Sequence, residues 1–357
     1  MLKARHVDKN SDTPGDDNSL SEIFDESALL IGGKISDNIG GSFEVANGAN
    51  DVVQAVDVNG TTVPGSYVSE GSGLGFSGKL TFTKPFSIGR LGITLFNTDA
   101  LGVFSGTEIY SSGLFRPIRQ FENRNKTNIL QKTGVGNGSA SGAQAYYYGH
   151  GLYATAGQYV PGYGQSIDVE TEGYKTFARA AYEFNLADFT IAAGGYYIGG
   201  DVINPVAQGQ LVGVVWTTDA NSLDRKSNGL DMQIEGAVSG MSLMVTGAIV
   251  LNNEYTEGGI IGASKMEDTG YSFDAQLNIL KDIGVKVAYL SSEFKDKTLN
   301  LTDDQSIISG GVEYNAAQNV RFVLEYSHTK YSGSENTPAN SNRDTDGDLL
   351  LMAMVAF

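Results

Sequence analysis

The strongest constraint in this sequence is a strict alternation of apolar and polar residues over segments of about ten to twelve residues, which begins near residue 170. From Tyr271 to Ile279, every second residue is apolar, and serine, aspartate, glutamine and asparagine fill the positions between. A period of two places alternate residues on opposite faces of a β-strand, whereas a helix groups apolar residues three and four positions apart. Long strands with one apolar and one polar face are therefore predicted, and the pattern recurs at 174–184, 230–238 and 320–326.

The links between these strands alternate between tight turns and long polar loops. Short turns on one rim and longer loops on the other are typical of an outer-membrane β-barrel, whose tilted strands need about 9 to 11 residues to cross the bilayer. Because lipid offers no partners to backbone polar groups, such a sheet must close on itself. We therefore predict an all-β fold, a closed antiparallel transmembrane β-barrel. The tight turns are expected at 185–187, 239–240, 281–282 and 315–318, and the long loops at 199–226, 252–267 and 333–344.

We predict about 16 strands, within a range of about 14 to 18. If the turn at Asp37 and Asn38 lies on the short-turn rim, the strand at 27–35 runs in the same direction as the last strand. An antiparallel barrel cannot close between two such strands, so a preceding strand is expected to be missing, together with a signal peptide. The strands are predicted at 27–35, 39–47, 51–58, 77–84, 88–97, 142–149, 151–160, 173–184, 188–199, 227–238, 241–251, 268–280, 283–294, 305–315, 319–330 and 346–357.

Two segments bound this barrel. Residues 1–26 are polar and lack the apolar stretch of a secretory signal, and we expect them to be disordered; residues 27–357 form the predicted barrel. At the other end, every second residue from Leu349 to Phe357 is apolar, and the strand ends on an aromatic residue, like the strand that barrel-insertion machinery recognises. Phe357 is the predicted insertion signal. The opposite face of this strand is also apolar, so we expect it to pack against an inserted loop; a buried strand of a soluble fold is the alternative.

Composition excludes several classes of protein. The chain has 41 acidic and 24 basic residues, a net charge of −17 and no cysteine. A disulfide framework, a thiolate metal site, an iron–sulfur cluster and a covalently attached c-type haem are all excluded. The acidic balance argues against nucleic-acid binding. The longest apolar run is the nine residues from Leu349 to Phe357, too short for a transmembrane helix, which needs about 20.

The polar faces of the strands and one irregular region are the candidate functional surfaces. Residues 99–140 break the strand rhythm, and we interpret them as a constriction loop folded into the pore, where fixed charge selects solutes. An external loop is the alternative. The predicted constriction residues are Arg116, Arg119, Glu122 and Arg124. The predicted lumen-facing residues, six acids and four bases that would favour cations, are Lys175, Arg179, Glu183, Asp231, Glu235, Asp274, Lys286, Glu313, Arg321 and Glu325.

Three strings resemble a known group of proteins: ALLIGGKISDNIGGSFEV at 28–45, LGITLFNTDALG at 91–102 and SSGLFRPIRQFENR at 111–124. They are similar to strings in porin-like outer-membrane β-barrel proteins of Gram-negative bacteria, some of them encoded near multihaem cytochromes. The resemblance covers most of the chain after residue 28. It implies a pore-forming or structural role in the outer membrane and carries over no catalytic residues.

Catalysis has little support, because His6, His150 and His328 are widely separated and no hydrolase or metalloprotease motif is present. No catalytic residue, metal site or cofactor is therefore predicted. The first hypothesis is a porin in the Gram-negative outer membrane, a channel for passive diffusion of small hydrophilic solutes or ions. The second is a structural barrel around a multihaem electron conduit. The expected partners are outer-membrane lipid, the barrel-insertion machinery and the solutes, with a periplasmic cytochrome in the second hypothesis.

Overall fold

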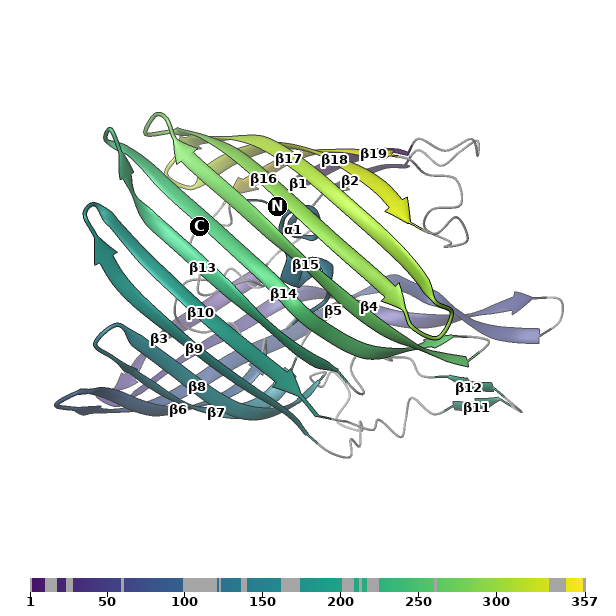
Figure 1. The fold of residues 1–357 in the computed structure, drawn as a ribbon, viewed down its shortest axis with the longest axis horizontal. Coiled ribbons are helices and arrows are strands. Elements are labelled where there is room, and N and C mark those ends of the chain that lie inside the picture. The colour runs from purple at the N-terminus through teal and green to yellow at the C-terminus, as the bar shows by residue number, and fades with distance from the viewer. Residues whose placement is uncertain are drawn as a thin grey trace.

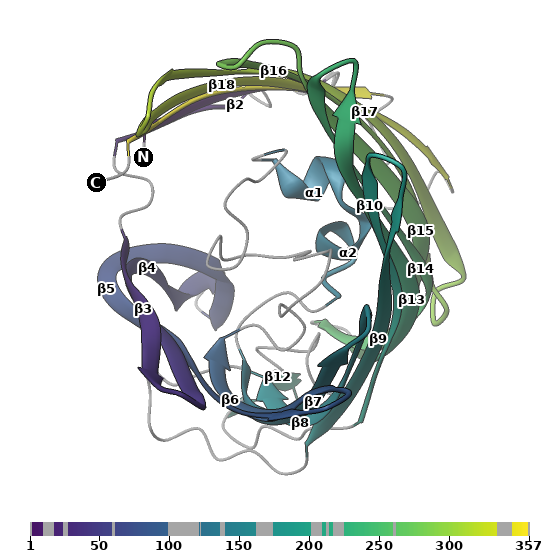
Figure 2. The ribbon, with the colours of Figure 1, turned by 90° about the vertical axis from the view of Figure 1, so that its left-hand side faces the viewer.

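The computed structural model describes residues 2–9, 18–23, 28–58, 61–98, 121, 123–135, 140–161, 174–200, 209–211, 214–216, 225–259, 262–333 and 345–355. Seventeen strands form one sheet. Figure 1 shows these strands lying side by side with a common tilt, and Figure 2 shows that they curve around a central space. This confirms the predicted antiparallel barrel architecture.

The strands of the large sheet carry the labels of Figure 1. They are β1 (Leu2–Lys9), β2 (Asn18–Ile23), β3 (Ala28–Ser36), β4 (Ile39–Val58), β5 (Thr61–Phe86), β6 (Gly89–Thr98), β7 (Ala140–Gly149), β8 (Leu152–Pro161), β9 (Lys175–Leu186), β10 (Phe189–Gly199), β13 (Lys226–Val238), β14 (Met241–Gly259), β15 (Gly262–Asn278), β16 (Ile283–Asp296), β17 (Leu301–Ala317), β18 (Val320–Gly333) and β19 (Thr345–Val355). A separate two-stranded sheet pairs β11 (Gly209–Leu211) with β12 (Val214–Trp216), and two short helices are α1 (Arg124–Thr127) and α2 (Ile129–Lys132).

Each strand pairs antiparallel with its neighbours along the chain, from β3 to β10, on to β13, and from there to β19. The tight turns of one rim fall at 37–38, 87–88, 150–151, 187–188, 239–240 and 318–319, in good agreement with the predicted turns. At three of these turns a residue other than glycine has a positive φ, His150 at 51°, Ala187 at 52° and Ser239 at 52°, as tight hairpins require. The short-turn rim of the sequence pattern is therefore present in the fold.

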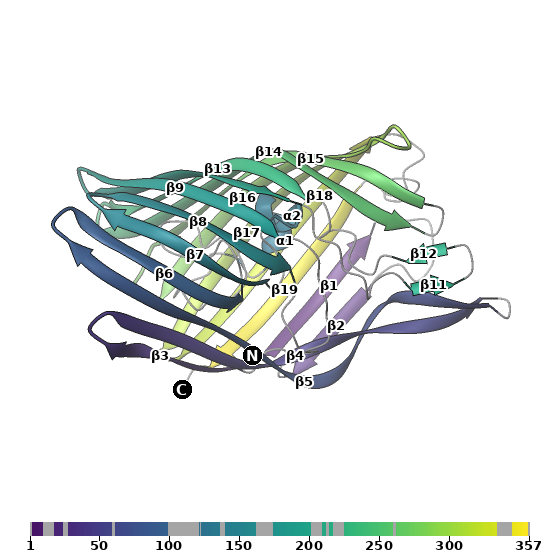
Figure 3. The same ribbon diagram turned by 90° about the horizontal axis from the view of Figure 1, so that it is seen from below.

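The N-terminal segment differs from our expectation. β1 pairs with β19 from Leu2 opposite Ala353 to Lys9 opposite Asp346, and β2 pairs with β1 on its other side. Figure 3 shows β1 and β2 beside β19. The prediction of disorder for 1–26 is therefore wrong at 2–9 and 18–23, and a strand that precedes β3 is present in the chain. The physical reason is that a strand ladder uses backbone groups, so a polar segment can satisfy the exposed edge of β19 as well as an apolar one.

β4 and β5 are longer than predicted. The strands expected at 39–47 and 51–58 are one strand of 20 residues, and its partner β5 has 26. Register shifts at Ala49/Asp51 and Val53/Ala55 absorb the break in alternation, so pairing continues through the residues between the two predicted strands. The resulting hairpin extends beyond the ends of the other strands (Figure 1).

The barrel buries charge and exposes apolar side chains. Ile308 on β17 is 64% exposed, whereas Glu325 on β18 and Lys175 on β9 are 1% and 2% exposed. A protein dissolved in water shows the opposite distribution, since Lys and Glu are almost never fully buried unless paired. The outer face therefore suits contact with acyl chains. The large apolar side chains on this face include Ile31, Ile35, Phe82, Ile93, Leu230, Phe273, Val287, Phe322, Leu324 and Leu351.

Aromatic residues also lie on the outer face. Tyr182 and Phe184 are exposed and stack with ring centroids 6.2 Å apart, and Tyr271 and Tyr289 lie 6.0 Å apart on neighbouring strands. A phenol places its ring in lipid and its hydroxyl among headgroups, which is the role of an aromatic girdle. Among the described residues, no helix is long and apolar enough to cross a membrane.

A charge on the outer face should destabilise the barrel. We expect Leu324→Arg to lower the free energy of unfolding by about 2–4 kcal/mol if Leu324 lies near the bilayer midplane and by about 0–1 kcal/mol near an interface. Urea titration of the protein folded in lipid vesicles measures this change. Leu299→Arg is the matched control, because Leu299 is 63% exposed in the turn between β16 and β17. Equal effects of the two substitutions would contradict the assignment of the outer face.

Candidate functional site

A segment of the chain lies inside the barrel and lines its interior. Residues 123–135, with α1 and α2, pack against the inner side of the wall formed by β14 to β17 (Figure 2). Asn128 precedes α2 and caps it, because its side-chain oxygen accepts hydrogen bonds from the backbone N–H of Leu130 at 2.9 Å and of Gln131 at 3.4 Å. This part of the predicted constriction loop at 99–140 is therefore inside the barrel.

The first half of the inserted segment is fixed to β15, β18 and β19 by hydrogen bonds. The backbone N–H of Asn123 donates to Glu325 Oε2 at 3.1 Å, and its side-chain amide donates to Asp348 Oδ2 at 2.8 Å. Lys126 Nζ donates to Thr329 Oγ1 at 3.0 Å. At α2, the backbone N–H of Ile129 donates to Ser272 Oγ at 3.0 Å. Two of these bonds, from the N–H groups of Asn123 and Ile129, satisfy backbone donors that would otherwise be unpaired at the start of each short helix.

The end of the inserted segment is held through its carbonyl groups. The side-chain amide of Asn253 donates to the backbone carbonyl of Thr133 at 3.0 Å and to Asp268 Oδ2 at 3.1 Å. Arg225 donates to the carbonyl of Gly134, and its guanidinium lies 5.0 Å from the centroid of the Tyr255 ring. Both carbonyls follow α2, where a helix leaves acceptors without partners. Two wall residues therefore complete the end of this helix.

An apolar core inside the barrel joins the segment to the wall. Ile129, Leu130 and Val135 are fully buried and cluster with inward-facing wall residues. At this level the wall departs from the polar-in pattern, because it faces protein and not solvent. The other members of this cluster are Phe96, Tyr159, Phe177, Tyr196, Ile198, Ala248, Val250, Leu290 and Ile307. The apolar inner face of the last strand is buried as well: Leu350 and Met352 are 5% and 3% exposed, on the strand whose Asp348 bonds to Asn123.

Two ion-pair networks line the inner wall. Arg179 on β9 and Asp231 on β13 form a buried bidentate pair, with Arg179 Nη2 and Asp231 Oδ1 2.6 Å apart. Lys286 on β16 lies 3.2 Å from Glu325 Oε1 and 3.7 Å from Glu313 Oε2, and its ammonium is 5.4 Å from the Phe121 ring centroid. Arg321 also pairs with Glu313. Most of the wall charges that we predicted therefore neutralise one another.

The structure places the predicted lumen-facing residues as follows. Lys175, Arg179, Asp231, Asp274, Lys286, Glu313 and Glu325 are buried; Glu183 and Arg321 are half-buried; and Glu235 is exposed. Of the predicted constriction residues, Arg124 is the first residue of α1, inside the barrel, and Arg116, Arg119 and Glu122 lie outside the described residues. The insertion signal Phe357 lies outside them too.

Sequence reasoning missed the residues that hold the inserted segment: Arg225, Asn253, Ser272, Thr329 and Asp348. Asn253 and Ser272 occupy polar positions in alternating strands, but nothing in that alternation distinguishes a residue that faces water from one that binds a loop. The available signal was the apolar inward residues, such as Leu290 and Leu350, which require a protein partner inside the barrel.

Lys132, the last residue of α2, is a titratable group of the interior. Its Nζ lies 5.7 Å from the centroid of the Phe294 ring. Burial and, to a smaller extent, the charge of Lys126 lower the pKa of Lys132 to about 8, against the opposing effect of the carboxylates of Asp303, Asp346 and Asp268. The positive charge at this position therefore changes within an accessible pH range.

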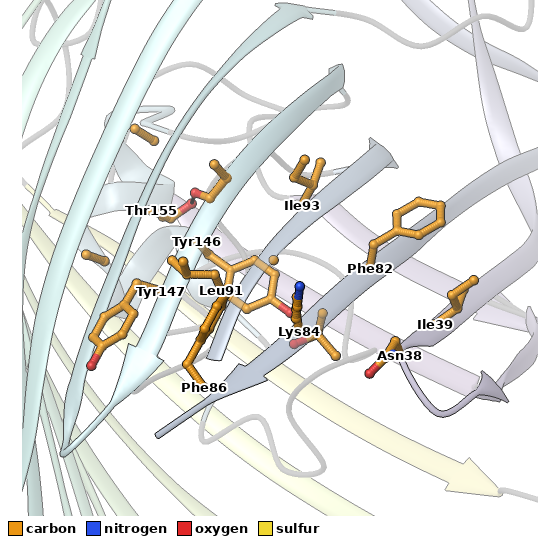
Figure 4. A pocket seen from close by; sticks show the side chains of 15 residues that line it. Asn38, Ile39, Phe82, Lys84, Phe86, Leu91, Ile93, Tyr146, Tyr147 and Thr155 are labelled. Carbon is orange, nitrogen blue, oxygen red and sulfur yellow. Dashed lines mark hydrogen bonds between the residues drawn. The ribbon is translucent and has the colours of Figure 1, made fainter. Parts of the chain in front are cut away.

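A hollow of about 1040 Å³ lies on the opposite side of the barrel, at β5 to β8. Figure 4 shows Phe82, Leu91 and Ile93 around it, all of them exposed apolar side chains of the outer face. Tyr146 reaches it from a neighbouring strand. Because most of its lining is apolar and Phe82, Leu91 and Ile93 belong to the outer face, this hollow suits contact with lipid better than with a hydrophilic solute.

Solved structures with the same architecture share little sequence with this chain. OmpT of Vibrio cholerae gives a TM-score of 0.53 at 12% identity, with 100% of this chain and 95% of that chain covered. The outer-membrane channel DcaP of Acinetobacter baumannii gives a TM-score of 0.53 at 12% identity, with 99% of this chain and 94% of that chain covered. OmpF of Salmonella typhi gives a TM-score of 0.52 at 14% identity, with 99% of this chain and 95% of that chain covered. No protein-family model matches the sequence, and no curated protein matches it.

This chain has the fold of an outer-membrane porin. The likeness of fold extends over the whole chain, although few residues are identical, which agrees with a fold specified by alternation more than by particular residues. In this porin fold, the inserted segment and the charged inner wall form the candidate site.

We expect the inserted segment of the porin fold to loosen when Asn253 is removed. Asn253→Ala deletes two hydrogen bonds to buried acceptors, which should lower the local opening free energy at residues 129–133 by about 1–3 kcal/mol. Amide hydrogen exchange in detergent measures it. Asn252→Ala, one residue along β14, is the control and should leave the exchange of 129–133 unchanged; equal exchange in both variants would contradict the proposed attachment.

Ion selectivity should depend on pH through Lys132. As pH rises from 7 to 9, the amine passes its pKa of about 8 and loses its charge, so the preference for cations should increase. Reversal potentials in a salt gradient measure this step, and Lys132→Met should abolish it. Lys297→Met is the control: Lys297 is in an exposed turn, the hydrogen bonds that it donates to Glu267 and Glu254 raise its pKa, and the step should persist. Persistence of the step in Lys132→Met would contradict the assignment.

Proposed function

We propose that this protein is a channel for passive diffusion of small hydrophilic solutes or ions across the outer membrane of a Gram-negative bacterium. The observation that carries the proposal is the inverted burial: apolar side chains cover the outer face, and charged side chains line an interior that also receives residues 123–135. Such an interior suits hydrated solutes, and fixed charge along it selects among them. The porin-fold neighbours agree with this function.

We propose no reaction for this protein. Among the described residues, no group of three or more His, Asp or Glu side chains could hold a metal ion. The buried carboxylates of the two wall networks, Asp231, Glu313 and Glu325, are engaged in ion pairs with arginine or lysine. Carboxylates held in this way stabilise structure, whereas a general base has to be free to accept a proton.

The hypothesis of a structural barrel around a cytochrome receives no specific support. The segment at 123–135 occupies part of the interior and is fixed there by several hydrogen bonds. A folded protein in the lumen would have to displace this segment and expose its apolar core. The channel is therefore the one function that we propose, with outer-membrane lipid, the barrel-insertion machinery acting on Phe357, and small solutes or ions as its partners.

We also propose that Arg116, Arg119, Glu122 and Arg124 form the constriction of this channel. The purified protein should give stepwise conductance in a planar lipid bilayer. Neutralising the three arginines together by substitution with glutamine should shift the reversal potential toward cation selectivity, because a ring of positive charge in a narrow passage repels cations.

The matched control for the constriction removes three basic residues from exposed positions of the wall: Lys265, Lys281 and Lys297. This variant should leave selectivity nearly unchanged. An unchanged reversal potential in the arginine variant would remove those residues from the constriction, and a silent bilayer with correctly folded protein would refute the channel itself.

A further inference from the structure

A second pocket, in which charged and hydroxyl-bearing side chains stand among a largely apolar lining, lies on the inner side of the barrel at the short-turn rim, away from the inserted segment. Its volume is about 820 Å³, and its lining residues come from β3 to β7 and from β9. Three of them lie close to tight turns: Asp37 in the first turn, Arg90 just after the turn at 87–88, and Tyr148 just before the turn at 150–151. The pocket therefore opens at one mouth of the proposed channel.

Two opposite charges in this pocket face the interior without ion-pair partners in the described part of the chain. Arg90 follows the alternation of β6, in which Leu91 and Ile93 are exposed on the outer face, so Arg90 points inward. Glu183 lies between Tyr182 and Phe184, which stack on the outer face, and so it points inward as well. Charges that are fixed on a wall and unpaired there are available to a solute.

The spacing of these two charges defines the solute. Arg90 is on β6 and Glu183 on β9, so three steps of about 4.8 Å separate their strands, about 14 Å at the backbone. Direct pairing is disfavoured at this separation. A solute with one carboxylate and one ammonium group several bonds apart can reach both side chains. A single amino acid is too short for this, whereas a short peptide is long enough.

The other side chains that line the pocket are also compatible with a short peptide. Tyr148, which is 46% exposed, is the direct cross-strand neighbour of Arg90 and lies between the two charges. Thr83 also lines the pocket, and its hydroxyl is buried without a hydrogen-bond partner within the described residues. Lys34 and Asp37 pair with each other at 2.6 Å and so add no net charge. The remaining charges are one cation and one anion.

We propose that this pocket is a binding subsite for short zwitterionic peptides, with Arg90 binding the carboxylate and Glu183 the ammonium group. This inference rests on the proposed channel function and names its solute class. The subsite would raise the local concentration of such solutes at the mouth, where weak binding assists passage without trapping.

The test uses three probes of nearly equal size in planar-bilayer recordings of the full chain: triglycine, its N-acetylated form and its C-terminal amide. Triglycine carries both charges, and each derivative keeps only one. Triglycine should reduce the ion current at a concentration about tenfold lower than either derivative, since each charge adds a charge-assisted hydrogen bond. Equal reduction of the current by all three probes would overturn the proposal.

Substitutions of Arg90 and Glu183 test which end of the peptide each of these residues binds. In Arg90→Gln, triglycine should reduce the current only at the concentration that its amide needs. In Glu183→Gln, it should need the same concentration as its acetylated form. Each substitution should therefore raise the effective concentration of triglycine about tenfold. Arg90→Lys should keep part of the preference. Lys281→Gln removes a charge from the turn between β15 and β16, outside the pocket, and should change nothing. If Arg90→Gln and Glu183→Gln both bind triglycine as the unaltered protein does, the assignment is wrong.

The outcome for the channel is separable from the outcome for the subsite. A folded protein that conducts no ions refutes the channel, and titration calorimetry of triglycine against the detergent-folded protein then tests the pocket directly. A protein that conducts ions but does not discriminate among the three probes keeps the channel and refutes the subsite.

Discussion

The need to pair every backbone N–H and C=O group governs this structure. In the hydrocarbon of a bilayer an unpaired group costs several kcal/mol, so a β protein can cross it only as a sheet whose strands all have neighbours. This requirement explains why the polar segment at Leu2–Lys9 forms a strand beside β19, although its side chains give no strand signal. It also explains why β4 and β5 stay paired through two register shifts. Side-chain pattern decides which face meets lipid, and backbone pairing decides how far the sheet extends.

The interior is held together by side-chain contacts: hydrogen bonds, an apolar core and ion pairs. The segment at 123–135 is attached at both ends by hydrogen bonds and in its middle by an apolar core, so the three parts support one another. The buried pairs of Arg179 with Asp231 and of Lys286 with Glu325 keep the charged wall neutral where water is excluded. Removing one partner of such a pair costs far more stability than the intact pair contributes, because the other charge stays buried and unpaired, and this favours retaining both residues.

The sequence predicted the wall well and the interior poorly. Alternation at 271–279 or 320–326 has a single interpretation, because a shift of one residue would turn every apolar side chain into the lumen. The turns at 187–188 and 239–240 followed from the same pattern. Short helices such as α1 and α2 have no comparable signal, since four residues are too few to show a period. The hydrogen bonds from Asn253 and Arg225 to the inserted segment span more than ninety residues of sequence, which local patterns do not encode.

The inserted helices pack mainly against β14 to β17, on one side of the barrel, whereas β5 to β8 meet them only through the shared apolar cluster, at Phe96 and Tyr159. A route for solutes through the described part of this barrel is therefore eccentric. Substitutions in the two halves of the wall should therefore have different effects in evolution. Those behind the helices change the stability of the fold, and those on the opposite half change which solutes pass through the proposed channel. In the proposed channel, selection for a different solute then acts on one half of the sheet while the other half keeps the molecule folded.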